Sequence, residues 1–361
     1  MIPLSRATVT EEMKQAILDV VDSGRFILGP EVKAFEKEFA DYIGVPHAIA
    51  VSQGTAAIQL ALQAIGVAPG DEVLVPSMTA FPTIEGVLHA GATPVFVDCD
   101  RFTCMDPEDA RRRVTDKTVG ILPVHLYGGV ADLDALGALA RDRGLWIVED
   151  SCQAHGALAG SRKVGSIGRA GTFSFYPSKN LTVFGDGGMV TTNEDAIAAR
   201  VRLLRDHGRS DKYTHVAVGY NLRFNEMQAA VGRKQLALLE DFIGKRRAVA
   251  SRYGETFSKL PDLAIPRERP GTRMVYHLYP VRCRDEKTRD ALREHLKGRG
   301  VETGIHYPIA NHLQPAMAGY GRPPSLPESE AVARTSLSLP MFPALSEDDV
   351  ATVISAVRDF F

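Results

Sequence analysis

Short apolar runs alternate with helical stretches through the middle of the chain, and this rhythm constrains the fold more than any other feature of the sequence. Between the first two runs lies GTAAIQLALQAIG, in which Ile58, Leu62 and Ile65 share one face of a helix. Strands that alternate with helices of this length form βαβ units. We therefore predict an α/β fold with a mostly parallel sheet flanked by helices. The runs occupy residues 47–52, 71–77, 93–98, 118–126 and 145–150.

The segments on either side of this pattern extend the prediction. Two helices are expected before it. One follows Thr10 and stops at Gly24, with Met13, Ile17, Val20 and Val21 on one face, and the other stops at Gly44. After it, residues 171–177 and 188–193 have the composition of strands, and residues 194–207 that of a helix.

The rhythm loosens from about residue 240, which predicts a smaller second domain. A long helix is followed by an expected strand at residues 275–283, a charged helix at 286–298 and a short strand at 303–308. The last helix begins with a capping box made by Ser346 and Asp349. We predict a large α/β domain over residues 1–240 and a small C-terminal α+β domain over residues 241–361.

Composition excludes several classes of protein. The 361 residues include 45 % hydrophobic and 24 % charged residues, with a net charge of −2, which is typical of a globular protein and not of a nucleic-acid binder. The sequence contains no apolar run long enough for a membrane helix, and its first residues lack the charged start and apolar stretch of a signal peptide, so we expect neither. The 4 cysteines have no metal-ligand spacing, so we expect neither a metal site nor disulfides, and a cytoplasmic location.

Four short elements contain residue types that bind a phosphorylated cofactor, and each also has an ordinary structural explanation. The SQGTAA segment at Gly54 offers backbone N–H groups at a helix start, although its threonine is also a helix cap. Asp150 ends an apolar run, where a carboxylate binds a ligand or caps a helix. Lys179 forms a Schiff base if burial removes its proton, but a single lysine usually lies on the surface. The GDGG segment at residues 185–188 allows close backbone approach or makes a turn.

The order of these elements is more informative than any one of them. A phosphate-binding turn, an aspartate at a strand end and, about thirty residues later, a Ser-x₄-Lys segment together meet the needs of pyridoxal 5′-phosphate (PLP). Lys179 would bond to the cofactor, and Asp150 would keep the pyridine nitrogen protonated so that the ring withdraws electrons. Ser174 and the turn at Gly54 and Thr55 would hold the phosphate.

The chain resembles the DegT/DnrJ/EryC1/StrS family of sugar aminotransferases, which have the PLP-dependent fold type I. The resemblance covers nearly the whole chain and includes the segments GTAAIQLAL, PGDEVLVPSMT, EDSCQAHGA, TFSFYPSKNLTVFGDGGMVTT, GYNLRFNEMQAA and HYP. It implies an enzyme with PLP as cofactor and pyridoxamine 5′-phosphate as the amino-carrying form. It also implies a homodimer with shared active sites.

The resemblance assigns roles to individual residues. Lys179 and Asp150 correspond to the catalytic lysine and the partner of the pyridine nitrogen, and Gln153 to the group near the cofactor's phenolic oxygen. The phosphate ligands correspond to Gly54, Thr55 and Ser174, and to Asn221 from the neighbouring subunit. The substrate pocket corresponds to Arg223, His306 and Tyr307, although packing at a surface or interface is the alternative for these.

Two positions depart from the family pattern. The family commonly has an aromatic residue that stacks on the pyridine ring where this chain has Ala80. We therefore expect either that the neighbouring Phe81 binds the cofactor ring or that a smaller group covers that face. Cys152 replaces a common alanine beneath the ring, and we expect it to have a packing role.

The resemblance also implies the reaction, in which an amino group moves from L-glutamate to a keto group of a nucleotide-linked sugar. Related sugar dehydratases carry histidine in place of the lysine, so Lys179 favours an aminotransferase. The SKNL and GDGG segments are more similar to enzymes that act on 3-keto sugars. The alternatives are a 4-keto nucleotide sugar, a cyclitol ketone, or a non-catalytic relative with a binding or regulatory role.

Overall fold

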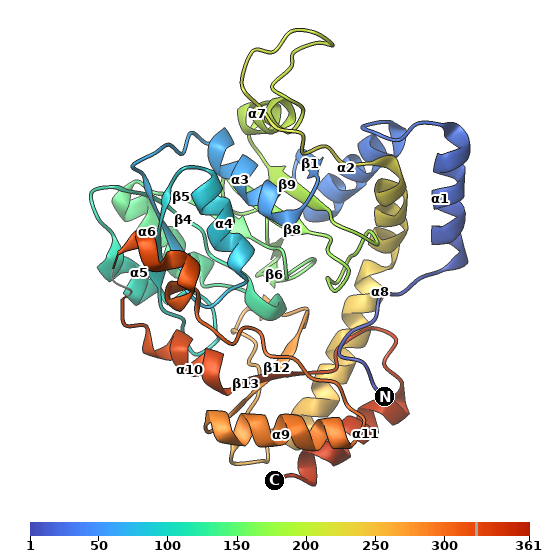
Figure 1. The fold of residues 1–361 in the computed structure, drawn as a ribbon, viewed down its shortest axis with the longest axis vertical. Helices are drawn as coiled ribbons and strands as arrows, with labels where there is room; N and C mark the ends of the chain where they lie inside the picture. The colour runs from blue at the N-terminus through green and yellow to red at the C-terminus, as the bar shows by residue number, and fades with distance from the viewer. Residues whose placement is uncertain (322–323) are drawn as a thin grey trace.

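A seven-stranded sheet forms the centre of the larger part of the protein (Figure 1). Its strands are β1 (His47–Val51), β2 (Glu72–Pro76), β3 (Thr93–Val97), β4 (Thr118–Ile121), β5 (Trp146–Asp150), β8 (Ala170–Ser174) and β9 (Gly188–Thr192). The computed structural model describes residues 1–321 and 324–361. In it the strands lie side by side in the order β1, β9, β8, β5, β4, β2 and β3. In this sheet β3, β2, β4, β5 and β8 run parallel to one another, and β9 runs antiparallel to its two neighbours β8 and β1. The prediction of a mostly parallel sheet is therefore confirmed.

Helices cover both faces of this sheet. Because side chains alternate along a strand, Ile49 and Val51 of β1 pack on one face, and Ala48 and Ala50 pack on the other. The first face is covered by α3 (Gly54–Ala64), α4 (Phe81–His89) and α7 (Asp195–Arg205). The second is covered by α2 (Pro30–Ile43), α5 (Pro107–Arg113), α6 (Leu133–Arg143) and the start of α8 (Glu226–Phe257).

The predicted N-terminal helices are confirmed. The first, α1 (Glu11–Ser23), begins where the Thr10 side chain accepts a hydrogen bond from the N–H of Met13, and ends at Gly24 in a left-handed conformation. The second, α2, ends in the same way at Gly44. Val21 differs from the prediction, because 48 % of it is exposed while Met13 and Val20 are buried.

A second, antiparallel sheet lies in the C-terminal part. It contains β10 (Leu263–Ala264), β12 (Tyr279–Cys283) and β13 (Ser336–Leu339), which pack with α9 (Glu286–Gly298), α11 (Glu347–Arg358) and the end of α8. The predicted capping box of Ser346 and Asp349 is present at the start of α11. Shorter elements are β6 (Leu158–Ala159), β7 (Arg162–Lys163), β11 (Thr272–Arg273) and α10 (Pro327–Thr335), with 3-10 turns at Leu126–Gly128, Asn311–Leu313 and Pro315–Tyr320.

Two predicted strands differ from the structure. The strand expected at residues 303–308 is wrong: only Gly304 bridges to Ser338, and the following residues leave the sheet. The strand expected at residues 275–283 begins only at Tyr279, because Tyr276 has a φ of 45° and breaks the extended conformation.

The helix α8 joins the two parts of the protein. It runs without interruption through residue 240 and packs against both α1 and α11 (Figure 1). The division at residue 240 thus falls inside a helix, and the assignment of two domains stays a prediction. Among residues 1–321 and 324–361, no helix has the length and apolar character needed to span a membrane.

Candidate active site

A cavity of about 580 Å³ lies beside the carboxyl ends of β5 and β8, where open α/β sheets bind ligands. Most of the predicted site residues meet there, although they come from segments far apart in the sequence. The predicted residues that line the cavity are Gly54, Thr55, Asp150, Gln153, Ser174, Lys179, His306 and Tyr307.

Asp150 ends β5 and is 3 % exposed. One of its carboxylate oxygens accepts a hydrogen bond from Thr83 Oγ1 at 2.8 Å, and the other from the N–H of Cys152 at 3.0 Å. No side chain in the described part of the chain forms an ion pair with it. Because a buried carboxylate needs a cation or several donors, this group fits the protonated nitrogen of a pyridine ring.

Lys179 lies in the turn that follows β8. Its N–H donates to the carbonyl of Tyr176 at 2.8 Å, which helps to fix this turn. Burial lowers the pKa of the Lys179 amine, while the nearby Cys152 and Asp150 oppose this shift. A lowered pKa increases the fraction of neutral amine, which is the form that reacts with a carbonyl group.

The start of α3 forms a cradle for an anion. No side chain caps this helix, because its N-cap residue Gln53 makes no such hydrogen bond. A Cβ atom at Gly54 would lie 2.8 Å from Ser174 Cβ, and one at Gly188 would lie 2.4 Å from the Gln53 carbonyl oxygen. Only glycine therefore permits this close approach, and the free N–H groups of the helix fit a phosphate.

Gln153 lines the cavity and connects two tyrosine residues. Its Oε1 accepts from the N–H of Tyr127 at 2.8 Å, and its Nε2 donates to the Tyr307 hydroxyl at 3.0 Å. Burial raises the pKa of Tyr307 to about 12, so its hydroxyl stays protonated. His306 bonds through Nδ1 to Ser338 Oγ at 3.0 Å, and its carbonyl accepts from the Tyr127 hydroxyl.

Three predicted site residues lie outside this cavity. Phe81 is the first residue of α4 and packs against the apolar cluster shared with α3, whereas Ala80 lines the cavity. This placement is in keeping with the second alternative, in which a smaller group covers the ring, and the assignment of Phe81 to the cofactor stays a prediction. Asn221 is exposed, and Arg223 pairs with Asp206 at 3.3 Å. In the single chain neither of these two residues reaches the cavity.

Cys152 lines the cavity beside Lys179 and Asp150. Burial, reinforced by the charge of Asp150, raises the pKa of its thiol well above the usual value. The thiol therefore stays protonated and is a poor nucleophile, in keeping with the expected packing role.

Several further residues line or support the cavity, and most of them belong to no motif in the sequence. Thr83 and Thr79 form a hydrogen-bonded pair beside Asp150, and His277 lines the cavity. Behind the site, the carboxylate of Glu149 is fully buried and accepts from His125 at 3.1 Å and from the N–H of Gly165 at 2.8 Å. The acidic pair at residues 149–150 was a visible signal for Glu149, but the threonines and His277 had none.

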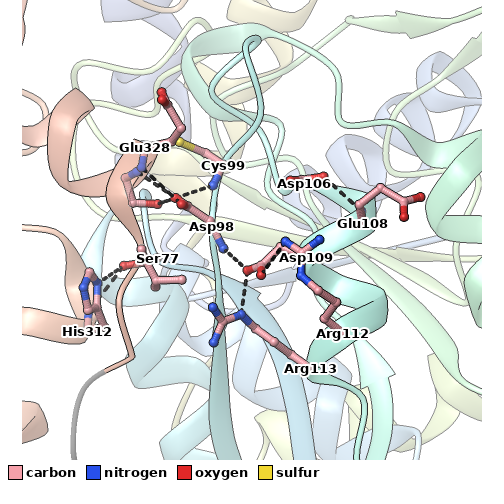
Figure 2. Close-up of polar contacts among 12 residues, drawn as sticks. Ser77, Asp98, Cys99, Asp106, Glu108, Asp109, Arg112, Arg113, His312 and Glu328 are labelled. Carbon is pink, nitrogen blue, oxygen red and sulfur yellow. Dashed lines mark hydrogen bonds and ion pairs between the residues drawn. The ribbon is translucent and has the colours of Figure 1, made fainter.

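A second group of polar side chains lies outside this cavity, around the ends of β2 and β3 (Figure 2). Ser77, which follows β2, bonds to His312 Nδ1 at 2.6 Å, and the Asp98 carboxylate accepts from the N–H of Glu328 at 3.1 Å. Asp109 accepts from the N–H of Asp98 at 2.8 Å. The bonds of Ser77 and of the Asp98 carboxylate connect the ends of β2 and β3 to the C-terminal part of the chain, and the bond of Asp109 connects β3 to α5. Elsewhere too, the described residues contain no group of three or more His, Cys, Asp or Glu that could hold a metal ion.

Comparisons with known proteins agree with this geometry. The sequence model of the DegT/DnrJ/EryC1/StrS aminotransferase family matches residues 7–358. A dTDP-3-amino-3,4,6-trideoxy-alpha-D-glucose transaminase from Streptomyces venezuelae is 46 % identical over 97 % of this chain and 92 % of its own length. A protein from Geobacillus stearothermophilus named as a pleiotropic regulatory protein is 42 % identical over 97 % of this chain and 96 % of its own length.

The fold is similar to that of solved aminotransferases. The crystal structure of S. venezuelae DesV in complex with a ketimine intermediate has a TM-score of 0.93 and 47 % identity, and the match covers 97 % of this chain and 94 % of that one. This likeness confirms the predicted PLP-dependent aminotransferase fold.

Proposed function

Because the chain belongs to the DegT/DnrJ/EryC1/StrS aminotransferase family, we propose that it transfers an amino group from L-glutamate to the 3-keto group of a nucleotide-linked sugar. Its cofactor is PLP, which when bound carries the amino group and withdraws electrons from the carbon that is deprotonated. The observation that carries the proposal is that one cavity is lined by the buried Asp150, by Lys179 and by the uncapped start of α3, and that among the described residues Asp150 has no ion-pair partner.

Different residues of this chain would bind the cofactor and transfer the proton. Asp150 would pair with the pyridine nitrogen, and Thr83 holds the carboxylate in place at 2.8 Å. Gly54, Thr55 and Ser174 would bind the phosphate at the start of α3. Lys179 would remove a proton from the substrate carbon and return one, as a general base and then a general acid. Its lowered pKa supports this role, since the base must be neutral to accept a proton.

The substrate side of the cavity would be formed by His306 and Tyr307. Both line the cavity, and the bond between Tyr307 and Gln153 ties the substrate wall to the cofactor wall. The choice of a 3-keto sugar is supported by the printed activity of the S. venezuelae relative, which is a 3-amino sugar transaminase. The relative named as a regulatory protein does not favour a non-catalytic role here, because this chain keeps Lys179 and Asp150 in one cavity.

We also propose a homodimer whose subunits share their active sites. Large apolar side chains are exposed on and near α1, among them Leu18 at 54 % and Ile27 at 51 %. Asn221 and Arg223 lie outside the cavity of their own chain, so in a dimer they are available to the other subunit. A cytoplasmic location is supported by the 4 cysteines, all of which are free and buried.

The experiment that tests this function offers the purified enzyme a choice of substrates. The protein is incubated with glutamate and either a 3-keto or a 4-keto nucleotide sugar, and the products are identified by mass spectrometry. We expect a 3-amino product from the wild type and none from Lys179→Ala. Exclusive formation of a 4-amino product would overturn the choice of ring position, and full activity of Lys179→Ala would overturn the proposed mechanism.

A further inference from the structure

A second cavity, of about 330 Å³, lies between the large part of the chain and the C-terminal sheet. Its walls come from the loop after β3, the turn after β4, the segment after β10 and one face of β12 and β13. Among the described residues, none lines both this cavity and the one that contains Lys179. Its volume is at the lower end of the range for ligand sites, so the cavity is separate and fits a small molecule.

Tyr127 lies between the two cavities. It lines the second cavity, while its N–H donates to Gln153 at 2.8 Å and its hydroxyl donates to the carbonyl of His306, both of which line the active-site cavity. The second cavity therefore lies behind the wall of the active site and is not an extension of it.

The pairing of three strands shows which side chains face this cavity. Ala264 of β10, Arg282 of β12 and Ser336 of β13 are paired in register and form one row across the sheet. Paired residues in a sheet have their side chains on the same face, and all three line the cavity. Leu337, the next residue of β13, belongs to the apolar core on the other face. The side chains of Arg282 and Ser336 therefore face the cavity.

The hydroxyl of Ser336 is a buried polar group without a partner. The residue is 2 % exposed, and its Oγ forms no hydrogen bond with any of the described residues. Ser338, two positions further along the same face, does have a partner, because its hydroxyl bonds to His306 at 3.0 Å. An unpaired buried hydroxyl costs free energy, and native proteins retain few of them. Ser336 thus needs a polar partner, which a molecule bound in the cavity would supply.

The wall of the cavity carries more positive than negative charge. Arg269 forms ion pairs with Asp100 and, at 3.0 Å, with Asp132. Its guanidinium also lies 4.4 Å from the centre of the Phe102 ring, so this arginine is neutralised and held in place. The charged side chains that line the cavity are those of Arg101, Arg267, Arg269, Arg282 and Glu328.

The other three arginines lack close acidic partners. Arg282 has one carboxylate nearby, that of Glu328 at 3.7 Å, which is beyond hydrogen-bond distance. Arg101 and Arg267 form no ion pair with any residue in the described part of the chain. Like charges around one cavity repel one another, and a bound anion would remove this repulsion. Guanidinium groups bind carboxylates and phosphates through paired hydrogen bonds, so this wall is suited to such an anion.

We propose that this cavity is a second ligand site, which binds a small organic anion through a carboxylate or phosphate group. That group accepts hydrogen bonds from Arg282 and from the hydroxyl of Ser336, which are neighbours across the sheet. Apolar side chains that also line the cavity, among them Leu126, Ile265 and Met274, contact the carbon part of the ligand. The site needs no step of transamination, so it does not depend on the proposed function.

The test measures the binding of two probe anions to the PLP-loaded protein by isothermal titration calorimetry. Inorganic pyrophosphate represents phosphate groups and citrate represents carboxylates, and both are titrated at constant ionic strength. We expect saturable binding of at least one probe, which Arg282→Gln weakens at least about tenfold. The probe that binds identifies the anionic group. Ser336→Ala should also weaken binding, but it should not lower the unfolding midpoint of the protein without the probe, because no hydrogen bond is lost.

A matched control is Arg284→Gln, which removes an arginine just after β12 that does not line the cavity and should leave binding unchanged. Should Arg282→Gln not fold, as judged by thermal unfolding, the exposed Arg267 is replaced instead, and Arg267→Gln should weaken binding about threefold. The absence of saturable binding of either probe up to about 10 mM would overturn the second site. Binding that the cavity variants leave as strong as in the wild type would overturn it as well, because the probe would then be bound elsewhere.

Discussion

The buried carboxylate of Glu149 offers a stringent test of how the fold supports the site. One of its oxygens accepts from the N–H of Ile167 at 2.7 Å and of Gly168 at 2.8 Å. The other accepts from Gly165 N–H at 2.8 Å and from His125 Nε2 at 3.1 Å. His125 Nδ1 accepts from a backbone N–H, that of Ala131, so Nε2 must be the nitrogen that carries the proton. All four partners of Glu149 are thus donors.

Glu149→Gln replaces one acceptor oxygen by an NH₂ group of nearly the same size. Whichever way the amide is oriented, its NH₂ faces two donors, which then have no acceptor. An unsatisfied buried donor costs about 1–3 kcal/mol, so we expect the free energy of unfolding to fall by about 2–6 kcal/mol. That is a large part of the ~5–15 kcal/mol that stabilises a typical protein.

The loss should also depend on pH. Burial alone would raise the pKa of Glu149, but the hydrogen bonds from His125 and the backbone outweigh it and lower the pKa below its usual value. Because the folded state prefers the ionised form, the stabilisation by Glu149 is fully present above a pH of about 4.3 and is lost as the pH falls through the lowered pKa. The difference between Glu149→Gln and the wild type should therefore shrink in acid.

Urea unfolding at neutral and acidic pH measures both effects. The control is Glu194→Gln, which breaks a largely exposed pair with Arg169 at 2.7 Å and should cost at most about 1 kcal/mol. If Glu149→Gln costs no more than this control at neutral pH, the four-donor arrangement does not stabilise the protein as argued.

Three further changes probe other parts of the account. Gly54→Ala places a Cβ atom 2.8 Å from Ser174 Cβ, so we expect PLP affinity, measured by equilibrium titration, to fall at least about tenfold; unchanged affinity would contradict the cradle at α3. Thr83→Val removes the 2.8 Å hydrogen bond to Asp150 and should lower kcat about tenfold without preventing folding; wild-type kcat would show that Asp150 needs no support. Burial lowers the pKa of His155 to about 3, so below pH ~6.5 the unfolded chain binds a proton that the folded protein does not. The wild type should therefore lose stability relative to His155→Phe by up to about 1.4 kcal/mol per pH unit as the pH falls. Parallel curves of unfolding free energy against pH would contradict the lowered pKa.

The sequence was sufficient to predict features that depend on neighbouring residues. The strand and helix pattern follows from local periodicity, and Lys179, Ser174 and Asp150 lie in short segments with recognisable order. Helix ends such as Gly24 and Gly44 were also predictable, because each needs one residue type at one place.

Features that depend on tertiary contacts could not be predicted in this way. Thr83 meets Asp150 across 67 positions, and His277 reaches the cavity only because distant backbone groups hold its segment. The sequence left open whether Phe81 or a smaller group covers the cofactor ring, and only the tertiary structure shows that Phe81, at the start of α4, packs against the α3 cluster. The prediction of a strand at residues 303–308 was wrong because only Gly304 pairs, while His306 and Tyr307 line the cavity.

The central claim is that the cavity beside β5 and β8 is a PLP site in which Lys179 bonds to the cofactor. The most direct measurement is borohydride reduction of the PLP-loaded protein, followed by proteolysis and mass spectrometry of the peptides. The account predicts a phosphopyridoxyl group on Lys179 alone, and none when Lys179→Ala is treated in the same way. A stable modification on another lysine of the wild type, or none at all, would contradict it.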